Sequence, residues 1–192
     1  MKHLSYLFVT FIIVAIFVGC KETTKKNVVK PIMVTQEEQQ NHADDSTIYG
    51  KCCEATTMNT LYIVDAKGDT LDFIIEDEAN VFGGKLVGDK MAVISKNEYG
   101  ENIAEQVINI MSLMGRWRSI DRDFEIKDGG VIESHQVAET KTFTSWKIFN
   151  GQLILAPDTF KIIMLGPDSL KLDDNKTGIY GFKRVDLTNE TN

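Results

Sequence analysis

The sequence predicts an all-β protein made of two small β-barrels in series. From Thr47 onward, polar and apolar residues alternate with a period of two, which is typical of half-buried strands. Turn signals rich in Gly, Asn, Asp and Pro separate the alternating runs, so neighbouring strands are expected to pair as hairpins. Residues 46–112 hold 5 basic and 11 acidic side chains, whereas residues 113–186 hold 11 of each. This change in charge balance indicates two separate modules.

The chain begins with a segment typical of export signals. Lys2 precedes an uncharged stretch over residues 4–18, which is shorter than the roughly 20 residues that a membrane-spanning helix needs. The motif "FVGC" at residues 17–20 resembles the lipobox of bacterial lipoproteins. The resemblance implies a signal peptide over residues 1–19 and a Cys20 that carries palmitate-like acyl chains. An uncleaved anchor or an ordinary signal peptide is the alternative.

The residue after Cys20 bears on the destination of the protein. An aspartate there would resemble the inner-membrane retention signal of Gram-negative lipoproteins, whereas this chain has Lys21. We therefore expect a lipid anchor in the outer membrane, and the sequence leaves open whether the protein faces the periplasm or the cell surface. Residues 20–45 contain few bulky apolar side chains, which predicts a flexible, disordered tether.

The first module, residues 46–112, has the pattern of a small barrel. A short helix is expected over residues 76–81, since Gly83 and Gly84 can end it. Three strands, a helical element and two more strands is the element order of an OB-fold. The strands are expected at residues 47–54, 59–64, 70–75, 89–96 and 102–111.

The second module, residues 113–186, has eight short strand-like runs joined by tight turns, and residues 187–192 form a tail. Eight consecutive antiparallel strands predict an up-and-down barrel. The runs cover residues 116–120, 123–127, 131–136, 142–149, 152–156, 159–165, 169–173 and 179–185.

Several motifs of this module resemble a known family. "GRWRSID", "FEIKDGG", "TSWKIFNGQLIL" and the closing "YGFKRV" resemble the lipocalin-like domains of bacterial surface lipoproteins, over Gly115 to Asp186. The resemblance implies a lipocalin-like barrel that binds a small apolar molecule, a lipid or a glycan fragment. The predicted strands are short, so the sequence leaves open whether side chains already fill the interior.

The floor of this barrel is predicted from Gly115, Trp117 and Arg184. In a closed barrel the first and last strands are neighbours, so Arg184 is expected over the indole of Trp117, while Gly115 lets the chain enter tightly. A bulge that shifts the register by one residue would put Lys183 there instead. A plain core role for Trp117, with no cation above it, is the other alternative.

The sequence predicts no enzyme, no metal site and no cofactor. Ser134 and His135 are neighbours in one strand, so their side chains face opposite ways. The same alternation separates Cys52 from Cys53, of which one is expected to be buried and the other to be a surface thiol. The histidines beyond the signal peptide are His42 and His135, and no two ligand types have a zinc-like spacing.

Charge and composition limit the remaining functions. A net charge of −7 without a basic block is a poor match for nucleic acid, whose binding depends on Lys and Arg. We expect a membrane-anchored lipoprotein that binds a small ligand in its second barrel. The alternative is a structural or protein-interaction lipoprotein, such as an inhibitor or accessory subunit of the cell envelope. A ligand site of this kind usually needs roughly 300 Å³ or more, so the interior volume distinguishes the two.

Overall fold

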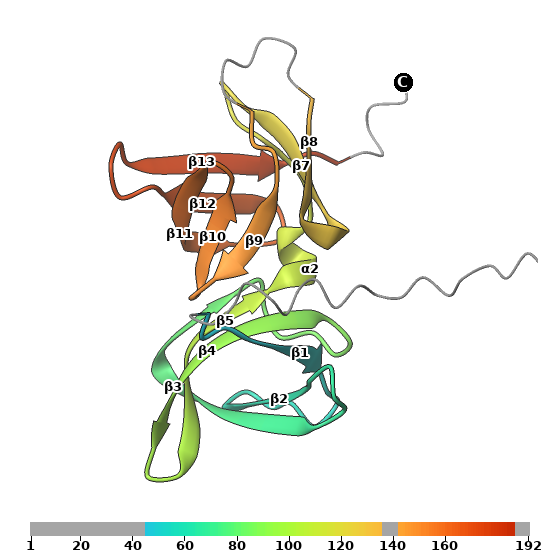
Figure 1. Cartoon of the computed structure of the whole chain (residues 1–192), viewed down its shortest axis with the longest axis vertical. Coiled ribbons are helices and arrows are strands. Elements are labelled where there is room, and N and C mark those ends of the chain that lie inside the picture. The colour runs from blue at the N-terminus through green and yellow to red at the C-terminus, as the bar shows by residue number, and fades with distance from the viewer. Residues whose placement is uncertain (1–44, 136–141, 187–192) are drawn as a thin grey trace, which may run out of the picture. The chain divides into compact units, whose positions relative to one another are not determined.

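The computed structural model describes residues 45–135 and 142–186, all of which belong to one compact unit, Ala43–Asn192. The predicted signal peptide, Cys20, the tether up to residue 44 and the tail 187–192 lie outside the described residues. The described chain forms a closed five-stranded barrel and then a nearly closed eight-stranded one (Figure 1), which confirms the all-β prediction. No helix of the described residues is long and apolar enough to cross a membrane.

The five-stranded barrel has the strand order β1-β2-β3-β5-β4, and β4 pairs back with β1 to close it. Strands β3 and β5 run parallel, and the other pairs are antiparallel. This order agrees with the predicted OB-like arrangement. The strands are β1 (Ile48–Cys52), β2 (Thr60–Val64), β3 (Thr70–Phe82), β4 (Lys90–Glu98) and β5 (Glu101–Asn109).

The helix predicted over residues 76–81 is wrong, because β3 continues through this segment to Phe82. The pairing of β3 with β5 shifts register between Ile75 and Asn80 and then resumes. The pairing with β5 therefore overrides the local helical preference of the acidic run. A four-residue helix, α2 (Ile110–Leu113), instead follows β5, and the side chain of Asn109 accepts a hydrogen bond from its Ser112 N–H at 3.0 Å.

The eight-stranded sheet has the order β8-β7-β6-β13-β12-β11-β10-β9, so the first and last strands, β6 and β13, are neighbours as predicted. Between β8 and β9 the described chain has a single isolated bridge, Val131 to Ser145. The strands are β6 (Gly115–Arg118), β7 (Asp123–Lys127), β8 (Val131–Ser134), β9 (Trp146–Phe149), β10 (Gln152–Leu155), β11 (Asp158–Leu165), β12 (Ser169–Asp173) and β13 (Ile179–Arg184).

The two barrels have different cores. The core of the five-stranded barrel is mostly aliphatic, with Phe73 as its aromatic side chain. The core of the eight-stranded barrel is rich in aromatic rings and also takes in Ala92 and Ile108 from the smaller barrel. The predicted boundary after residue 112 falls inside α2, whose buried Ile110 and Leu113 belong to this second core.

Candidate functional site

The structure brings Gly115, Trp117 and Arg184 together at the seam of β6 and β13. Trp117 and Arg184 are directly paired across the two strands. The guanidinium carbon of Arg184 lies 4.2 Å from the centroid of the Trp117 ring, within the range of a cation–π contact. Gly115 has φ +123°, and a Cβ at this position would overlap the guanidinium of Arg184. The glycine is therefore needed for its backbone conformation, and a larger residue would also displace the guanidinium group of Arg184.

The same guanidinium group also binds the end of α2. Arg184 donates from Nη1 to the carbonyl of Met114 at 2.7 Å and from Nη2 to the carbonyl of Ser112 at 2.5 Å. Trp117 donates from Nε1 to the carbonyl of Leu113 at 2.9 Å. Burial lowers the pKa of Arg184 from its usual value, which is so high that the group stays charged. The floor therefore has a structural role, because the N–H groups of Arg184 and Trp117 named here donate to carbonyls of the chain itself.

Side chains fill the interior of the eight-stranded barrel. Phe124 makes edge-to-face contacts with Phe143 and Phe182, at centroid distances of 5.1 and 5.3 Å. Phe143 in turn contacts Phe160 at 5.9 Å. All strands except β8, whose Ile132 is half-buried, contribute buried residues, among them Trp117, Phe124, Ile126, Ile148, Leu153, Leu155, Leu170, Leu172 and Phe182. The interior is thus a packed core.

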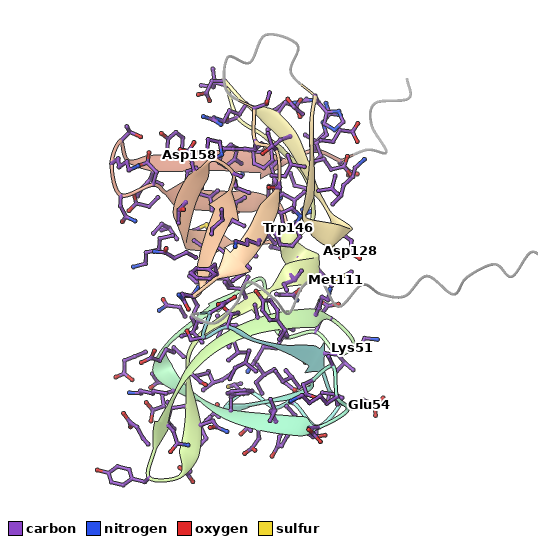
Figure 2. The ribbon with its side chains drawn as sticks, viewed as in Figure 1. Lys51, Glu54, Met111, Asp128, Trp146 and Asp158 are labelled. Atoms are coloured by element: carbon purple, nitrogen blue, oxygen red, sulfur yellow. The ribbon has the colours of Figure 1, made fainter. Side chains whose placement is uncertain are left out.

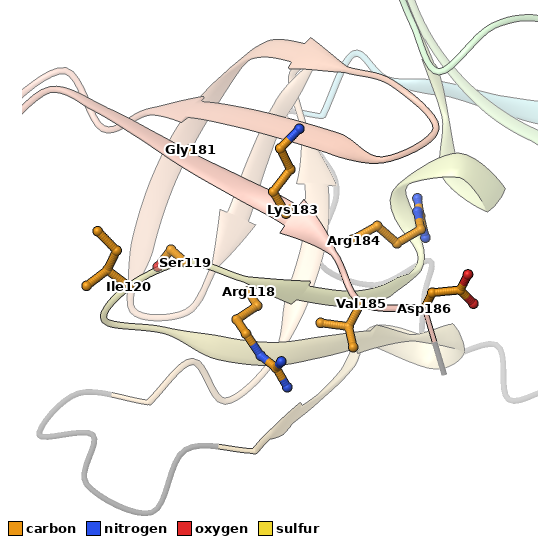
Figure 3. A pocket seen from close by; sticks show the side chains of 8 residues that line it. All are labelled: Arg118, Ser119, Ile120, Gly181, Lys183, Arg184, Val185 and Asp186. Atoms are coloured by element: carbon orange, nitrogen blue, oxygen red, sulfur yellow. The ribbon is translucent and has the colours of Figure 1, made fainter. Parts of the chain in front are cut away.

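A groove of about 630 Å³ lies instead on the outer surface of the β6–β13 seam (Figure 3). Strand alternation places Arg118 and Lys183 on the outside, opposite the buried Trp117 and Phe182. Gly181 has no side chain, so the backbone in the middle of β13 is exposed in the groove. The residues that line the groove are Arg118, Ser119, Ile120, Gly181, Lys183, Arg184, Val185 and Asp186.

A cluster of charged side chains continues from this groove across β6 and β7. Asp123 accepts hydrogen bonds from Nε of Arg116 at 2.8 Å and from Nε of Arg118 at 2.7 Å. The hydrogen bonds from Arg116, followed by those from Arg118, hold the pKa of Asp123 below its usual range. Asp123 therefore stays ionised and keeps Arg118 at the rim of the groove.

Beside this cluster lies a group that the sequence did not reveal. The ligand atoms of Glu125, Glu133 and His135 all lie within 4.8 Å of one another on the β7–β8 hairpin. His135 is half-buried, and its Nε2 lies 3.4 Å from Oε2 of Glu125. A sequence signal for this group exists: Glu133 and His135 form a Glu-x-His pair after the tight "DGG" turn. In a hairpin, the strand before the turn places its own carboxylates opposite such a pair.

The two cysteines of the small barrel are free thiols, as their positions in the strand pattern predicted. Cys52 is buried in the core of this barrel, whereas Cys53 is half-exposed. The Cys52 thiol lies 3.4 Å from the hydroxyl of Thr56. Neither thiol belongs to the groove or to the group around His135.

Compared with protein families, curated proteins and solved structures, the chain matches none. The fold and the groove define its class: an all-β protein of two barrels, with a packed second barrel and an external groove between strands β6 and β13 of that barrel.

Proposed function

We propose that the protein is a lipid-anchored interaction protein of the bacterial cell envelope, acting as an accessory subunit or an inhibitor rather than as an enzyme. Acylated Cys20 holds the chain in the outer membrane, and residues 21–45 act as a tether. The two barrels then present rigid outer surfaces to a protein partner. The "FVGC" motif and Lys21 support the anchor and its location.

One observation carries the interaction role: side chains fill the interior of the eight-stranded barrel. A binding pocket usually encloses 70–90% or more of a small ligand, which a packed interior cannot do without large rearrangement. A concave surface lies instead on the outside, in the groove where Ile120 is fully exposed and Arg118 and Lys183 are also exposed. Such a surface is suited to a partner that covers it from outside.

The charges of the groove indicate the chemistry of the partner. Two exposed cations, Arg118 and Lys183, line it together with one acidic residue, Asp186, whereas the guanidinium group of Arg184 is already bound to the carbonyls of Met114 and Ser112. We therefore expect the partner to offer an apolar side chain that covers Ile120, flanked by acidic groups. Complementary charges of this kind mainly set specificity and the rate of association.

Site-specific cross-linking in intact membranes tests this role. A photo-cross-linking amino acid in place of Ile120 should give a discrete protein adduct, and Lys183→Glu should weaken that adduct. The matched control carries the same amino acid in place of Tyr99, another fully exposed side chain, on the hairpin tip of the smaller barrel. Equal adducts from both positions, or none from position 120, would argue against the groove as the contact surface.

The anchor is tested separately. Metabolic labelling with an alkynyl fatty acid should mark the native chain and should fail to mark Cys20→Ala. Label that persists in the mutant would contradict lipidation at Cys20, whatever the result of the cross-linking.

A second function, binding of a small ligand, is favoured by the size of the groove. Its volume of about 630 Å³ exceeds the lower limit of roughly 300 Å³ for ligand sites. A lipid or glycan fragment with an anionic group would match the cations at its rim. Native mass spectrometry of the intact protein, released from membranes in mild detergent, distinguishes the two: a retained small molecule that Lys183→Glu loses would favour this second function.

A further inference from the structure

The outer face of the β7–β8 hairpin gathers two carboxylates and an imidazole. Glu125 and Glu133 are directly paired across the two strands. His135 lies two residues beyond Glu133 and therefore on the same face of the sheet. Its backbone N–H donates to the carbonyl of Asp123 at 2.8 Å, which holds this end of the hairpin against β7.

Two carboxylates that lie directly opposite each other repel, and a cation between them relieves this repulsion. Lys127 supplies one: its Nζ forms a close ion pair with Glu133 and lies 3.7 Å from Oε2 of Glu125. The side chain of Lys127 is 42% exposed, and a lysine stem is flexible. The ammonium can therefore swing out into water and leave both carboxylates to another cation.

The imidazole decides which cation suits the site. An ammonium needs only the carboxylates, yet His135 points its Nε2 at the same Glu125 carboxylate that Lys127 approaches. One nitrogen and two carboxylate oxygens form a donor set that zinc and similar transition-metal ions accept, whereas calcium and magnesium prefer oxygen alone. The nearby Arg116 donates two hydrogen bonds to Asp123, which direct its guanidinium group towards that carboxylate.

We propose that Glu125, Glu133 and His135 form a surface site for a divalent transition-metal ion, with zinc as the best match, and that the ion competes with Lys127 for the two carboxylates. Three protein ligands leave the fourth position of a tetrahedral zinc ion open to water or to a side chain of a partner. This proposal does not depend on the lipid anchor or on the partner groove.

Zinc itself is the probe for the experiment. ZnCl₂ is titrated by calorimetry into the intact protein in detergent, in a Cys53→Ser background that removes the more exposed thiol of the small barrel. We expect one zinc ion per chain. His135→Ala should weaken binding by about tenfold or more, comparable to or beyond the loss caused by removing a supporting residue of a metal site. His42→Ala, which changes a histidine outside the described residues, is the matched control and should bind zinc like the parent.

Competition with Lys127 gives the decisive measurement. Lys127→Met removes the ammonium and keeps much of the stem, so zinc should bind more tightly than it binds the parent. Zinc should also raise the thermal midpoint of the parent but not that of His135→Ala, because a ligand stabilises only the fold that binds it. Unchanged zinc affinity in either His135→Ala or Lys127→Met, with both variants folded by circular dichroism, would overturn the site.

Discussion

The two barrels close in different ways. In the five-stranded barrel, β1 and β4 close the sheet through four consecutive residue pairs, Ile48 with Val93 to Lys51 with Lys90. In the eight-stranded barrel, the described residues show a single isolated bridge at this place, from Val131 of β8 to Ser145, the residue before β9. Backbone hydrogen bonds therefore close the small barrel, whereas the described residues of the larger one join its two end strands mainly through other contacts.

Side chains hold the open seam of the larger barrel. Trp146, at the start of β9, donates from Nε1 to the carbonyl of Lys127 at 2.6 Å, next to the turn that carries Asp128 (Figure 2). Phe143 packs against Phe124 of β7, and the guanidinium of Arg122 lies 4.4 Å from the centre of the Phe143 ring. These contacts span the gap that strand pairing leaves.

The interiors of the two barrels differ because the barrels differ in width. A barrel widens with the number of its strands, so aliphatic side chains that fill five strands leave space inside eight. The larger barrel meets this need with aromatic rings, which meet edge to face. The interior of a wider barrel can thus be packed as fully as that of a narrow one, and the number of strands alone does not indicate a ligand cavity.

The largest expected effect comes from removing an aromatic ring of the larger barrel. Trp117→Ala should lower the free energy of unfolding by about 3 to 5 kcal/mol, because it deletes a fully buried ring and leaves a cavity. Chemical denaturation measures the loss. Binding of a small apolar dye to the folded variant, but not to the native protein, would sharpen the comparison by showing that the ring fills the interior. A loss below about 1 kcal/mol would contradict a packed interior.

The charged cluster outside the larger barrel gives the next effect. Asp123→Asn should cost about 1.5 to 3 kcal/mol at neutral pH, since two charged hydrogen-bond donors lose their carboxylate. The folded pKa of Asp123 is lowered, so its stabilisation is present above its usual pKa of about 3.9 and is lost as the pH falls through the folded value. Unfolding free energies measured against pH should therefore converge for native and mutant protein in acid.

The small barrel offers the control for this prediction. Glu98 pairs with Lys96 at 2.8 Å, but both side chains are more than two-fifths exposed. Exposed pairs of this kind are screened by water and salt, so Glu98→Gln should leave stability unchanged. An equal loss in both mutants would show that burial of the Asp123 cluster does not matter.

The seam itself can be weakened without emptying the core. Trp146→Phe keeps an aromatic ring but removes the N–H that reaches Lys127, and should cost about 1 to 2 kcal/mol. Hydrogen exchange should speed up in β8 and β9, and not in β1 and β4, where the ladder closes the barrel. Trp117→Phe, which removes a similar N–H bond to Leu113 away from β8 and β9, is the matched control. Faster exchange at β8 and β9 in this control as well would contradict closure of the seam by Trp146.

The smallest expected effect is the coupling of Trp117 and Arg184. The double mutant of Trp117→Ala and Arg184→Ala should differ from the sum of the single mutants by about 1 kcal/mol, the range for a half-buried cation–π contact. Equilibrium denaturation of all four proteins gives the value. Simple additivity would mean that Arg184 acts only through its hydrogen bonds to α2.

The sequence by itself determined the fold class, most strands and the floor of the larger barrel. Alternation and turn residues are local signals, and the predicted strands over 123–127 and 169–173 match β7 and β12 residue for residue. The meeting of Trp117 with Arg184 followed from one topological fact, that the first and last strands of a closed barrel are neighbours.

Only the tertiary structure decided the rest, because it depends on contacts between distant segments. The acidic run over 76–81 has local helical preference, but pairing with β5 makes it a strand. Whether the larger barrel is hollow depends on the summed volumes of side chains from many strands, which no local pattern records. Likewise, Glu125 and His135 are ten residues apart in the chain and meet because the register of the β7–β8 hairpin puts them on one face.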